Sequence, residues 1–410
     1  MTLVAVADPN EDNGASALEA AGWAHDQWER TDSDQTAASI TRAGRAVLVP
    51  DFEALDTSQI DVVVESTGHP TIGARSALQA IRLGRHVVMV TVEADVTCGW
   101  GLAREARSQG VVYSLTAGDQ PGAIMELVEW SSSLGLHVVA VGRGTRFYPY
   151  DAAGDPDDAF QRYGYDDNLV KRRRLNPQMY NSFRDGTKAQ IEMCAVSNMT
   201  ALPPDIRGMH QPSASIYDLP VLFGPRAQGG ILVRDGIVDL ANAVASDGTT
   251  VLPNNIETGV WAVVRSEQPL VQDDLAFYGL PTDPSGLRAV LHRPFHLCGI
   301  ETPGTIAQAA LLGTSTGTCR DEPTSEVITI AKHNLGPGDV LDGSGGRNVR
   351  GIIERAEIVA RDRLLPLGFA YGTPLTRPIK AGEAIPMDAV LVVDNVITEL
   401  RKQHLDNEPI

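Results

Sequence analysis

Residues 60–91 have the sequence IDVVVESTGHPTIGARSALQAIRLGRHVVMVT, and this stretch decides the fold. It begins with a run of β-branched residues, passes Gly68 and Pro70 into a segment with helical periodicity, and ends in a second apolar run at 86–91. Apolar runs of this length that alternate with helices are typical of a parallel sheet covered on both faces. The stretch therefore predicts a strand–helix–strand unit with parallel strands.

The same alternation continues on both sides of this unit and predicts a doubly wound, Rossmann-like α/β nucleotide domain over residues 1–150. We expect further strands at 3–10, 45–50, 111–116 and 137–142, and further helices at 15–24, 100–110 and 122–135.

The start of this domain departs from the dinucleotide-binding pattern. That pattern begins with a strand and a G-x-G-x-x-G loop, followed about 20 residues later by a second strand that ends in an acidic residue. Asp8 fits the acidic residue, but only one strand precedes it. We therefore expect that the first strand and the glycine loop are lacking in this chain, through a misassigned start or a true loss. Alternatively, Asp8 is a turn residue before Pro9.

Length and charge narrow the class of protein. The chain has 410 residues and a net charge of −18, which suits two or three domains and disfavours nucleic acid or an anionic membrane as a partner. No apolar run reaches the ~18 residues of a membrane span, and the N-terminus does not resemble a signal peptide. We expect a cytoplasmic protein whose four scattered cysteines are reduced and not catalytic.

Polar residues follow the predicted strands at one edge of the sheet. A strand that ends in small residues lets the backbone approach a cofactor closely, so we expect Ser66, Thr67 and Gly68 to contact it, together with Glu93 and Ala94 after the next strand. The alternatives are a simple strand-to-helix turn at 66–68 and a helix-capping role for the acidic residue.

Four residues are candidates for the chemistry. Lys188 and Glu192 are four residues apart and share one face of a predicted helix, which begins after Asp185. An ammonium and a carboxylate lining a pocket can polarise a carbonyl and move a proton, whereas at the surface they form an ordinary ion pair. Asp119 stands at the start of a helix, where it is a further acid–base candidate or a cap.

The remaining sequence predicts two further domains and a tail. We expect an α+β substrate domain at 151–324, with strands near 229–236 and 258–266 and a lid, mobile loop or partly helical insertion at 144–177. The basic run 171–174 is either a grip for a phosphate or carboxylate or a solvated helix face. A β-rich module at 325–395 is followed by a tail at 396–410.

Several stretches together resemble the homoserine-dehydrogenase-like NAD(P)-dependent oxidoreductases with a C-terminal SAF domain, including 1-deoxy-D-xylulose 5-phosphate reductoisomerase-like enzymes of isoprenoid biosynthesis. The resemblance covers nearly the whole chain, but GRGTRFY (142–148) has arginines where the family has a lysine. The matching stretches are VAVADPN (4–10), IDVVVESTG (60–68), VTVEADVTCG (90–99), AGDQPGAIM (117–125), NPQMYNSFRDGTKAQIEMCAVSN (176–198), LHRPFHLCGIETP (291–303), ITIAKHNLGPGDVLDGSGG (328–346) and LLPLGFAYGTPLTRPIKAGEAI (364–385).

The resemblance implies an NADP- or NAD-dependent oxidoreductase that acts as a homo-oligomer on a small polyol, ketose or hydroxy-acid with or without a phosphate group. The segments at 60–68, 90–95 and 117–121 would surround the nicotinamide, and the helix with Lys188 and Glu192 would face it. A reductoisomerase would also need a divalent cation, for which Asp119, Asp185 and Glu192 could supply oxygen ligands. The alternatives are a homoserine-type dehydrogenase and a non-catalytic regulatory or scaffolding paralogue with a decayed nucleotide site.

Overall fold

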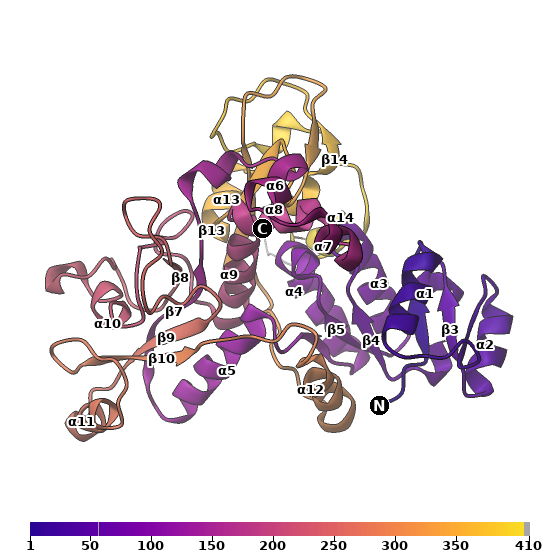
Figure 1. Ribbon diagram of the computed structural model, residues 1–410, viewed down its shortest axis with the longest axis horizontal. Coiled ribbons are helices and arrows are strands. Elements are labelled where there is room, and N and C mark those ends of the chain that lie inside the picture. The colour runs from indigo at the N-terminus through magenta and orange to yellow at the C-terminus, as the bar shows by residue number, and fades with distance from the viewer. Residues whose placement is uncertain (56, 406–410) are drawn as a thin grey trace.

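The computed structural model describes residues 1–55 and 57–405. Figure 1 shows a mixed α/β architecture: an N-terminal part with parallel strands, a second part built on another sheet, and a β-rich C-terminal module above them. One long helix, α9 (Thr187–Thr200), lies where the three parts meet.

The N-terminal part contains two parallel three-stranded sheets, ordered β1-β3-β2 and β4-β5-β6, instead of the one continuous sheet that the sequence predicts. The strand β2 and the helix α2 are additions that the sequence analysis missed. The elements are β1 (Ala5–Ala7), α1 (Glu11–Ala20), β2 (Trp28–Arg30), α2 (Asp34–Arg42), β3 (Ala46–Val49), β4 (Val62–Glu65), α3 (Pro70–Arg82), β5 (His86–Met89), α4 (Val92–Gln109), β6 (Tyr113–Leu115) and α5 (Gln120–Ser133).

Helix α4 begins eight residues before the predicted start at residue 100 and bends at Cys98, whose φ of −153° is not helical. Glu93 and Asp95 lie in its first turn, where carboxylates are favoured by the partial positive charge of a helix N-terminus. The helix therefore starts immediately after β5 and places Glu93 at the carboxyl edge of the sheet.

The strand predicted at 137–142 exists, but it does not join the nucleotide-domain sheet. It becomes β7 (His137–Thr145), which pairs with β8 (Ile237–Asn242) and β9 (Val260–Arg265) in a mixed sheet ordered β10-β9-β7-β8, with β10 at Arg288–Arg293. Residues 229–236 form no strand, since β8 starts only at Ile237. Both corrections concern long-range pairing, which local periodicity does not encode.

The segment predicted as a lid or a partly helical insertion is partly helical. It carries the short helices α6 (Ala159–Arg162) and α7 (Asp167–Arg173) and leads into α8 (Pro177–Arg184). The basic residues 171–174 are all exposed, which fits the solvated-face alternative. The other helices of this part are α10 (Leu219–Leu222), α11 (Pro269–Phe277) and α12 (Thr302–Ala307).

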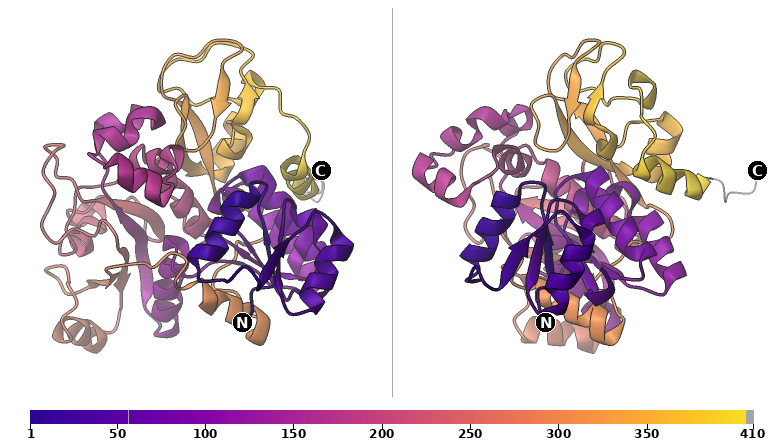
Figure 2. Two further views of the ribbon diagram at one scale, coloured as in Figure 1. Left: turned by 45° about the vertical axis from the view of Figure 1, so that its right-hand side comes forward. Right: turned by 90° about the vertical axis from the view of Figure 1, so that its right-hand side faces the viewer.

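The C-terminal module is β-rich, as predicted, and holds two antiparallel pairs, β11 with β13 and β12 with β14. Its last helix, α14, is not a free tail: Figure 2 shows it against the N-terminal part, where Arg401 pairs with Glu326 and lies over the ring of Trp100. The elements are β11 (Ser325–Ala331), β12 (Val340–Asp342), β13 (Val349–Arg355), α13 (Ala356–Asp362), β14 (Tyr371–Pro374) and α14 (Val396–Leu405).

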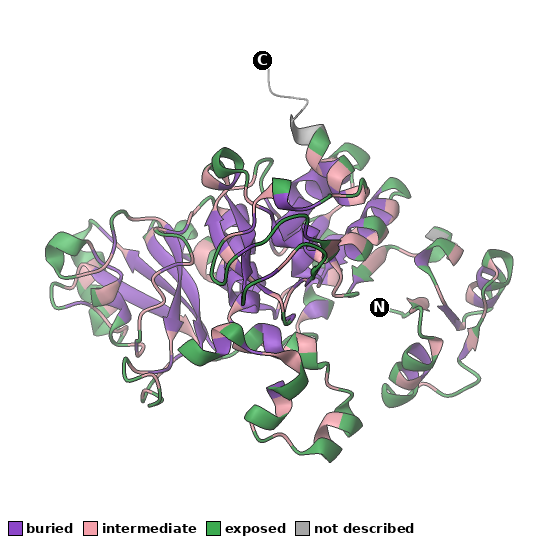
Figure 3. Cartoon of the chain, turned by 90° about the horizontal axis from the view of Figure 1, so that it is seen from above, coloured by how far each residue is buried: buried purple, intermediate pink, exposed green. Residues whose placement is uncertain are grey.

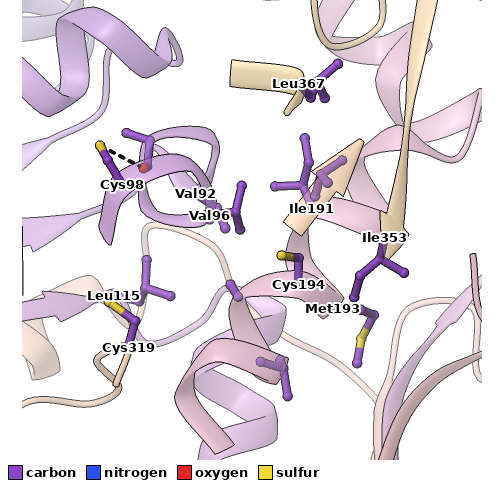
Figure 4. Packing of buried hydrophobic residues seen from close by; sticks show 14 of the residues in the cluster. Val92, Val96, Cys98, Leu115, Ile191, Met193, Cys194, Cys319, Ile353 and Leu367 are labelled. Atoms are coloured by element: carbon purple, nitrogen blue, oxygen red, sulfur yellow. Dashed lines mark hydrogen bonds between the residues drawn. The ribbon is translucent and has the colours of Figure 1, made fainter. Parts of the chain in front are cut away.

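The main hydrophobic core is shared by all three parts. In Figure 4, Val92 and Val96 of α4 lie on one side of α9, while Leu367 and Ile353 of the C-terminal module lie on the other. Residues 187–199 of α9 are all buried, and Figure 3 shows burial concentrated in the central elements. A helix that is buried all round can hold polar side chains only if they find partners, so those on α9 mark a site or a structural network.

Within the described residues, no helix combines the length and apolar character needed to cross a membrane. All four cysteines are free thiols, three of them buried.

Candidate active site

Lys188 lies in the first turn of α9 and reaches across to α4. Its Nζ donates a hydrogen bond to Oε1 of Glu93 over 3.0 Å, and the two side chains are only 9% and 6% exposed. Burial alone would lower the pKa of Lys188, but the nearby carboxylates, first Glu93 and then Asp119 and Glu192, outweigh it and raise the pKa above its ordinary value. Lys188 is therefore an ammonium at neutral pH and acts as a hydrogen-bond donor rather than a base.

Glu192 lies one turn further along α9 and pairs with Arg143 of β7, not with Lys188. Burial raises the pKa of Glu192 to about 7; Arg143 opposes this change, and the charge of Asp119 adds to it. A carboxyl group with a pKa near neutrality can both give and accept a proton under ordinary conditions. The surface ion pair considered for Lys188 and Glu192 is wrong, because both side chains are buried and each has another partner.

Asp119 follows β6 and caps helix α5. Its Oδ1 accepts a hydrogen bond from the backbone N–H of Gln120 at 3.0 Å, which confirms the predicted capping role. The same carboxylate contributes to the charge around Lys188 and Glu192, and the Sγ of Cys298 lies 3.7 Å from Oδ1. Capping and membership of the charged cluster are therefore compatible.

Gln120 connects this cluster to the substrate part. With its amide nitrogen turned toward Asp119, the side chain donates to Oδ1 at 2.6 Å, while its oxygen lies 3.2 Å from Arg143 and 2.9 Å from Nε2 of His296. The other ring nitrogen of His296 faces the carbonyl oxygen of Thr258 at 2.8 Å. A polar chain thus runs from the end of β6 to the loop after β10.

The carboxyl ends of β4 and β5 are tied together beside the charged cluster. The backbone N–H of Gly68 donates to Oγ1 of Thr91 at 2.9 Å, and that of Thr67 donates to Oε1 of Glu65 at 2.8 Å. Ser66 and Thr67 are exposed, and Gly68 has a φ of +72°, a conformation that favours glycine. This edge is open enough to meet a bound molecule.

The other two predicted cofactor residues lie in different surroundings. Ala94 is fully buried in the core on α4, next to Glu93. Asp8 lies at the carboxyl end of β1 in the other parallel sheet, where its Oδ1 accepts a hydrogen bond from the N–H of Asn10 at 2.8 Å. Asp8 therefore lies in a different sheet from the strands β5 and β6 that precede Glu93 and Asp119, and Ala94 is a core residue beside Glu93.

Asp185 is also separate from the cluster. It forms a fully buried ion pair with Lys332 of the C-terminal module, at 2.7 Å between Oδ2 and Nζ, and its Oδ1 accepts from the N–H of Thr187. Burial raises the pKa of Asp185, and the charge of Lys332 opposes this change. Its geometry is that of a link between α9 and the C-terminal module.

In the described part of the chain, no group of three or more His, Cys, Asp or Glu residues has the arrangement of a metal site. Of the three carboxylates considered as oxygen ligands, Asp185 and Glu192 are each paired with a buried cation. The protein side chains as arranged therefore do not fit a divalent cation.

Sequence reasoning missed several residues that complete the site. Arg143 stands in the GRGTRFY segment where a family lysine was expected, and its pairing with Glu192 depends on β7 belonging to the second sheet. Gln120 and His296 are 176 residues apart in the sequence, so their contact could not be predicted from local patterns. In the sequence, Gln120 directly follows Asp119 at a predicted helix start, and His296 lies within the stretch 291–303 that carries the family resemblance.

One family model matches part of the chain. Residues 118–302 match the family model described as "Oxidoreductase DRL, catalytic domain". This range contains Asp119, Arg143, Lys188 and Glu192, whereas Glu93 lies before it. A search of curated proteins finds no match. The chain is an enzyme of the oxidoreductase class, and the comparison leaves its substrate open.

Solved structures with similarity to the chain include a homoserine dehydrogenase from Thiobacillus denitrificans, 13% identical with a TM-score of 0.37, covering 92% of this chain and 97% of that one. An oxidoreductase from Bacillus cereus is 12% identical with a TM-score of 0.27, covering 70% and 82%. DOX-P reductoisomerase in complex with NADPH, fosmidomycin and magnesium is 14% identical with a TM-score of 0.29, covering 47% and 51%. All three TM-scores are below 0.5, so no property of the chain is inferred from them.

Proposed function

We propose that the protein is an NAD(P)-dependent oxidoreductase that interconverts a carbonyl and a hydroxyl group on a small polyol, ketose or hydroxy-acid, with or without a phosphate group. The observation that carries this proposal is the buried ammonium of Lys188, which lies among the carboxylates of Glu93 after β5, Asp119 after β6 and Glu192 on α9. Ligands of open parallel α/β sheets bind outside the carboxyl ends of the strands.

The chain's own residues fit a nicotinamide cofactor at this edge. A Cβ added at Gly68 would meet only the Cε of Met179 within 4 Å, at 3.9 Å, so the backbone there is accessible to a ligand. The half-buried carboxylate of Asp8 at the end of β1 supports recognition of a ribose hydroxyl, which favours NAD, whereas the family resemblance favours NADP. When bound, the cofactor supplies the hydride donor or acceptor.

Lys188 positions and polarises the reacting oxygen. One of its three N–H groups is used by Glu93, which leaves two for a substrate oxygen. Because the neighbouring carboxylates keep it protonated, it can stabilise negative charge on the oxygen as a carbonyl is reduced or a hydroxyl is oxidised. Glu93 fixes the direction of the ammonium.

Glu192 is the stronger candidate for proton transfer. Its pKa of about 7 lets it donate a proton to the nascent hydroxyl in reduction or take one up in oxidation. Asp119 adds negative charge on the same side and, through Gln120, links the cluster to His296. No step is assigned to a divalent cation, because the protein ligands do not fit one.

The experiment that tests the function is a substrate screen in which turnover is measured as the change in absorbance of NADPH or NADH at 340 nm. The panel contains ketoses, ketose phosphates including 1-deoxy-D-xylulose 5-phosphate, hydroxy-acids, and homoserine with its aldehyde. We expect cofactor-dependent turnover of at least one member and, for Lys188→Met, a loss of about 30-fold or more in kcat/KM, since a charge-assisted hydrogen bond contributes about 2 kcal/mol.

Lys171→Met is the matched control, because Lys171 is an exposed lysine on α7. It should leave turnover unchanged. Turnover of homoserine alone would assign the dehydrogenase alternative, and full activity in Lys188→Met would contradict the proposed site.

A further inference from the structure

A cavity of about 270 Å³ lies beside the start of α9. Its lining comes from the segment after β7, from the start of α9, from the loop at 208–211 and from β13, and includes Phe147, Gln190, Gln211 and Arg350. Lys188, Glu192 and Glu93 do not line it. The cavity has room for roughly nine water molecules at about 30 Å³ each, or for one small metabolite.

Arg350 is the charged group of this cavity that has no partner. It lies on β13 next to Gly351, whose N–H donates to Oγ1 of Thr187 at 3.0 Å, so that the strand packs directly on α9. A Cβ at Gly351 would lie 2.6 Å from Val327 and 3.1 Å from Thr187, and this close approach directs Arg350 and Ile352 to the cavity side. In the described structure the guanidinium of Arg350 makes no hydrogen bond and no ion pair, and Asp185 is the one charged group whose field acts on it.

The carboxylate of Asp185, whose charge acts on Arg350, does not neutralise it, because this carboxylate is already paired with another cation. Asp185 pairs with Lys332, whose Nζ also donates to the carbonyl oxygens of Gly154 at 2.9 Å and Gly346 at 2.6 Å. Arg350, Lys332 and Asp185 together therefore carry a net charge of one positive unit beside the cavity. Burial lowers the pKa of Arg350, with Asp185 opposing this effect, which shows that the guanidinium is partly desolvated without full compensation.

Gln211 supplies a second unpartnered polar group, on a strained backbone. Met209 and Gln211 have φ values of +69° and +50°, which cost of order 1–3 kcal/mol each for residues other than glycine. The carboxylate of Asp239 holds the loop by accepting from the N–H groups of His210 at 3.1 Å and Gln211 at 2.9 Å. The side-chain amide of Gln211 has no hydrogen-bond partner among the described residues and is free to donate into the cavity.

We propose that this cavity is a binding site for a small anion that carries a phosphate or carboxylate group. The guanidinium of Arg350 binds two oxygens of this group side by side, and the amide of Gln211 donates to a third oxygen of a phosphate or to a remaining lone pair of a carboxylate. Occupancy would supply the counter-charge that Arg350 lacks and would link the C-terminal module to α9, the helix that carries Lys188. The proposal concerns a site separate from the Lys188 cluster and does not rest on the proposed function.

The test is calorimetric titration of the full chain, without cofactor or substrate, with inorganic phosphate and separately with malonate, at constant ionic strength. We expect saturable binding of at least one anion, at least tenfold weaker binding in Arg350→Gln, and intermediate binding in Arg350→Lys, which keeps the charge but loses the two-pronged geometry. Tighter binding of phosphate would assign a phosphorylated ligand, and tighter binding of malonate a carboxylic acid.

Arg355→Gln is the matched control, because Arg355 lies at the other end of β13, outside the cavity, and should bind as the wild type does. Gln211→Ala, expected to weaken binding about threefold, tests the site without touching the strand, in case Arg350→Gln fails to fold. The proposal is overturned if the wild type shows no saturable binding of either anion up to 20 mM, or if Arg350→Gln and Gln211→Ala both bind as tightly as the wild type.

Discussion

Replacing Lys188 with Met should destabilise the chain as well as inactivate it. The ammonium and Glu93 are both more than nine-tenths buried and 3.0 Å apart, so the substitution leaves a carboxylate in the interior without its cation. Breaking a buried pair by removing one partner costs about 3–5 kcal/mol, mostly from the uncompensated charge that remains. Asp119 and Glu192 add repulsion to Glu93 in the variant, so we expect the upper part of that range.

The double variant Glu93→Gln/Lys188→Met removes both charges and should recover most of the stability. Urea unfolding followed by far-ultraviolet circular dichroism gives the free energy of unfolding for the wild type, both single variants and the double variant, and hence the coupling between the two sites. We expect a coupling of about 2 kcal/mol or more. A coupling below about 0.5 kcal/mol, or a Lys188→Met variant as stable as the wild type, would refute the reasoning.

Three further predictions concern pH, packing and the last helix. Burial raises the pKa of Glu192 from 4.5 to about 7, so between these pH values the folded chain holds a proton that the unfolded chain releases. The free energy of unfolding should therefore fall by on the order of 3 kcal/mol as pH rises through this window. Urea unfolding at several pH values should show this loss in the wild type and not in Glu192→Gln. Gly144→Ala should prevent stable folding, because its Cβ would lie 1.5 Å from the carbonyl oxygen of Ile256, whereas Gly304→Ala, with nothing within 4 Å, should melt at or above the wild-type temperature in calorimetry. Ending the chain before Val396 should uncover the apolar surface of α4 and α3, and light scattering should then show aggregation.

Most of the N-terminal elements, although not β2 and α2, could be predicted from sequence because they are encoded locally. The β-branched runs at 60–67 and 86–91 and the helical periodicity at 71–84 lie within two residues of the observed β4, β5 and α3. The sheet order could not be predicted, because pairing depends on contacts between distant residues. For the same reason β7 was assigned to the wrong sheet, although its position in the chain was correct.

The candidate site was predicted in part. Lys188 and Glu192 could be placed on one helix face by their spacing, and Asp119 at a helix start, and the structure brings these three into one charged cluster. The partners of the two α9 residues, Glu93 and Arg143, come from elements 95 and 49 residues away, so spacing could not identify them as partners. Asp185 shows the converse: it is close to Lys188 in sequence but is held by the C-terminal module instead.

The most direct test of the account is the turnover of the double variant Glu93→Gln/Lys188→Met. It should be folded and nearly as stable as the wild type, so that any loss of activity reports on chemistry rather than on unfolding. With the best substrate and cofactor from the screen, the account predicts a loss of at least 30-fold in kcat/KM, corresponding to about 2 kcal/mol of transition-state stabilisation. Wild-type kcat/KM in this stable double variant would contradict the claim that Lys188 acts on the reacting oxygen.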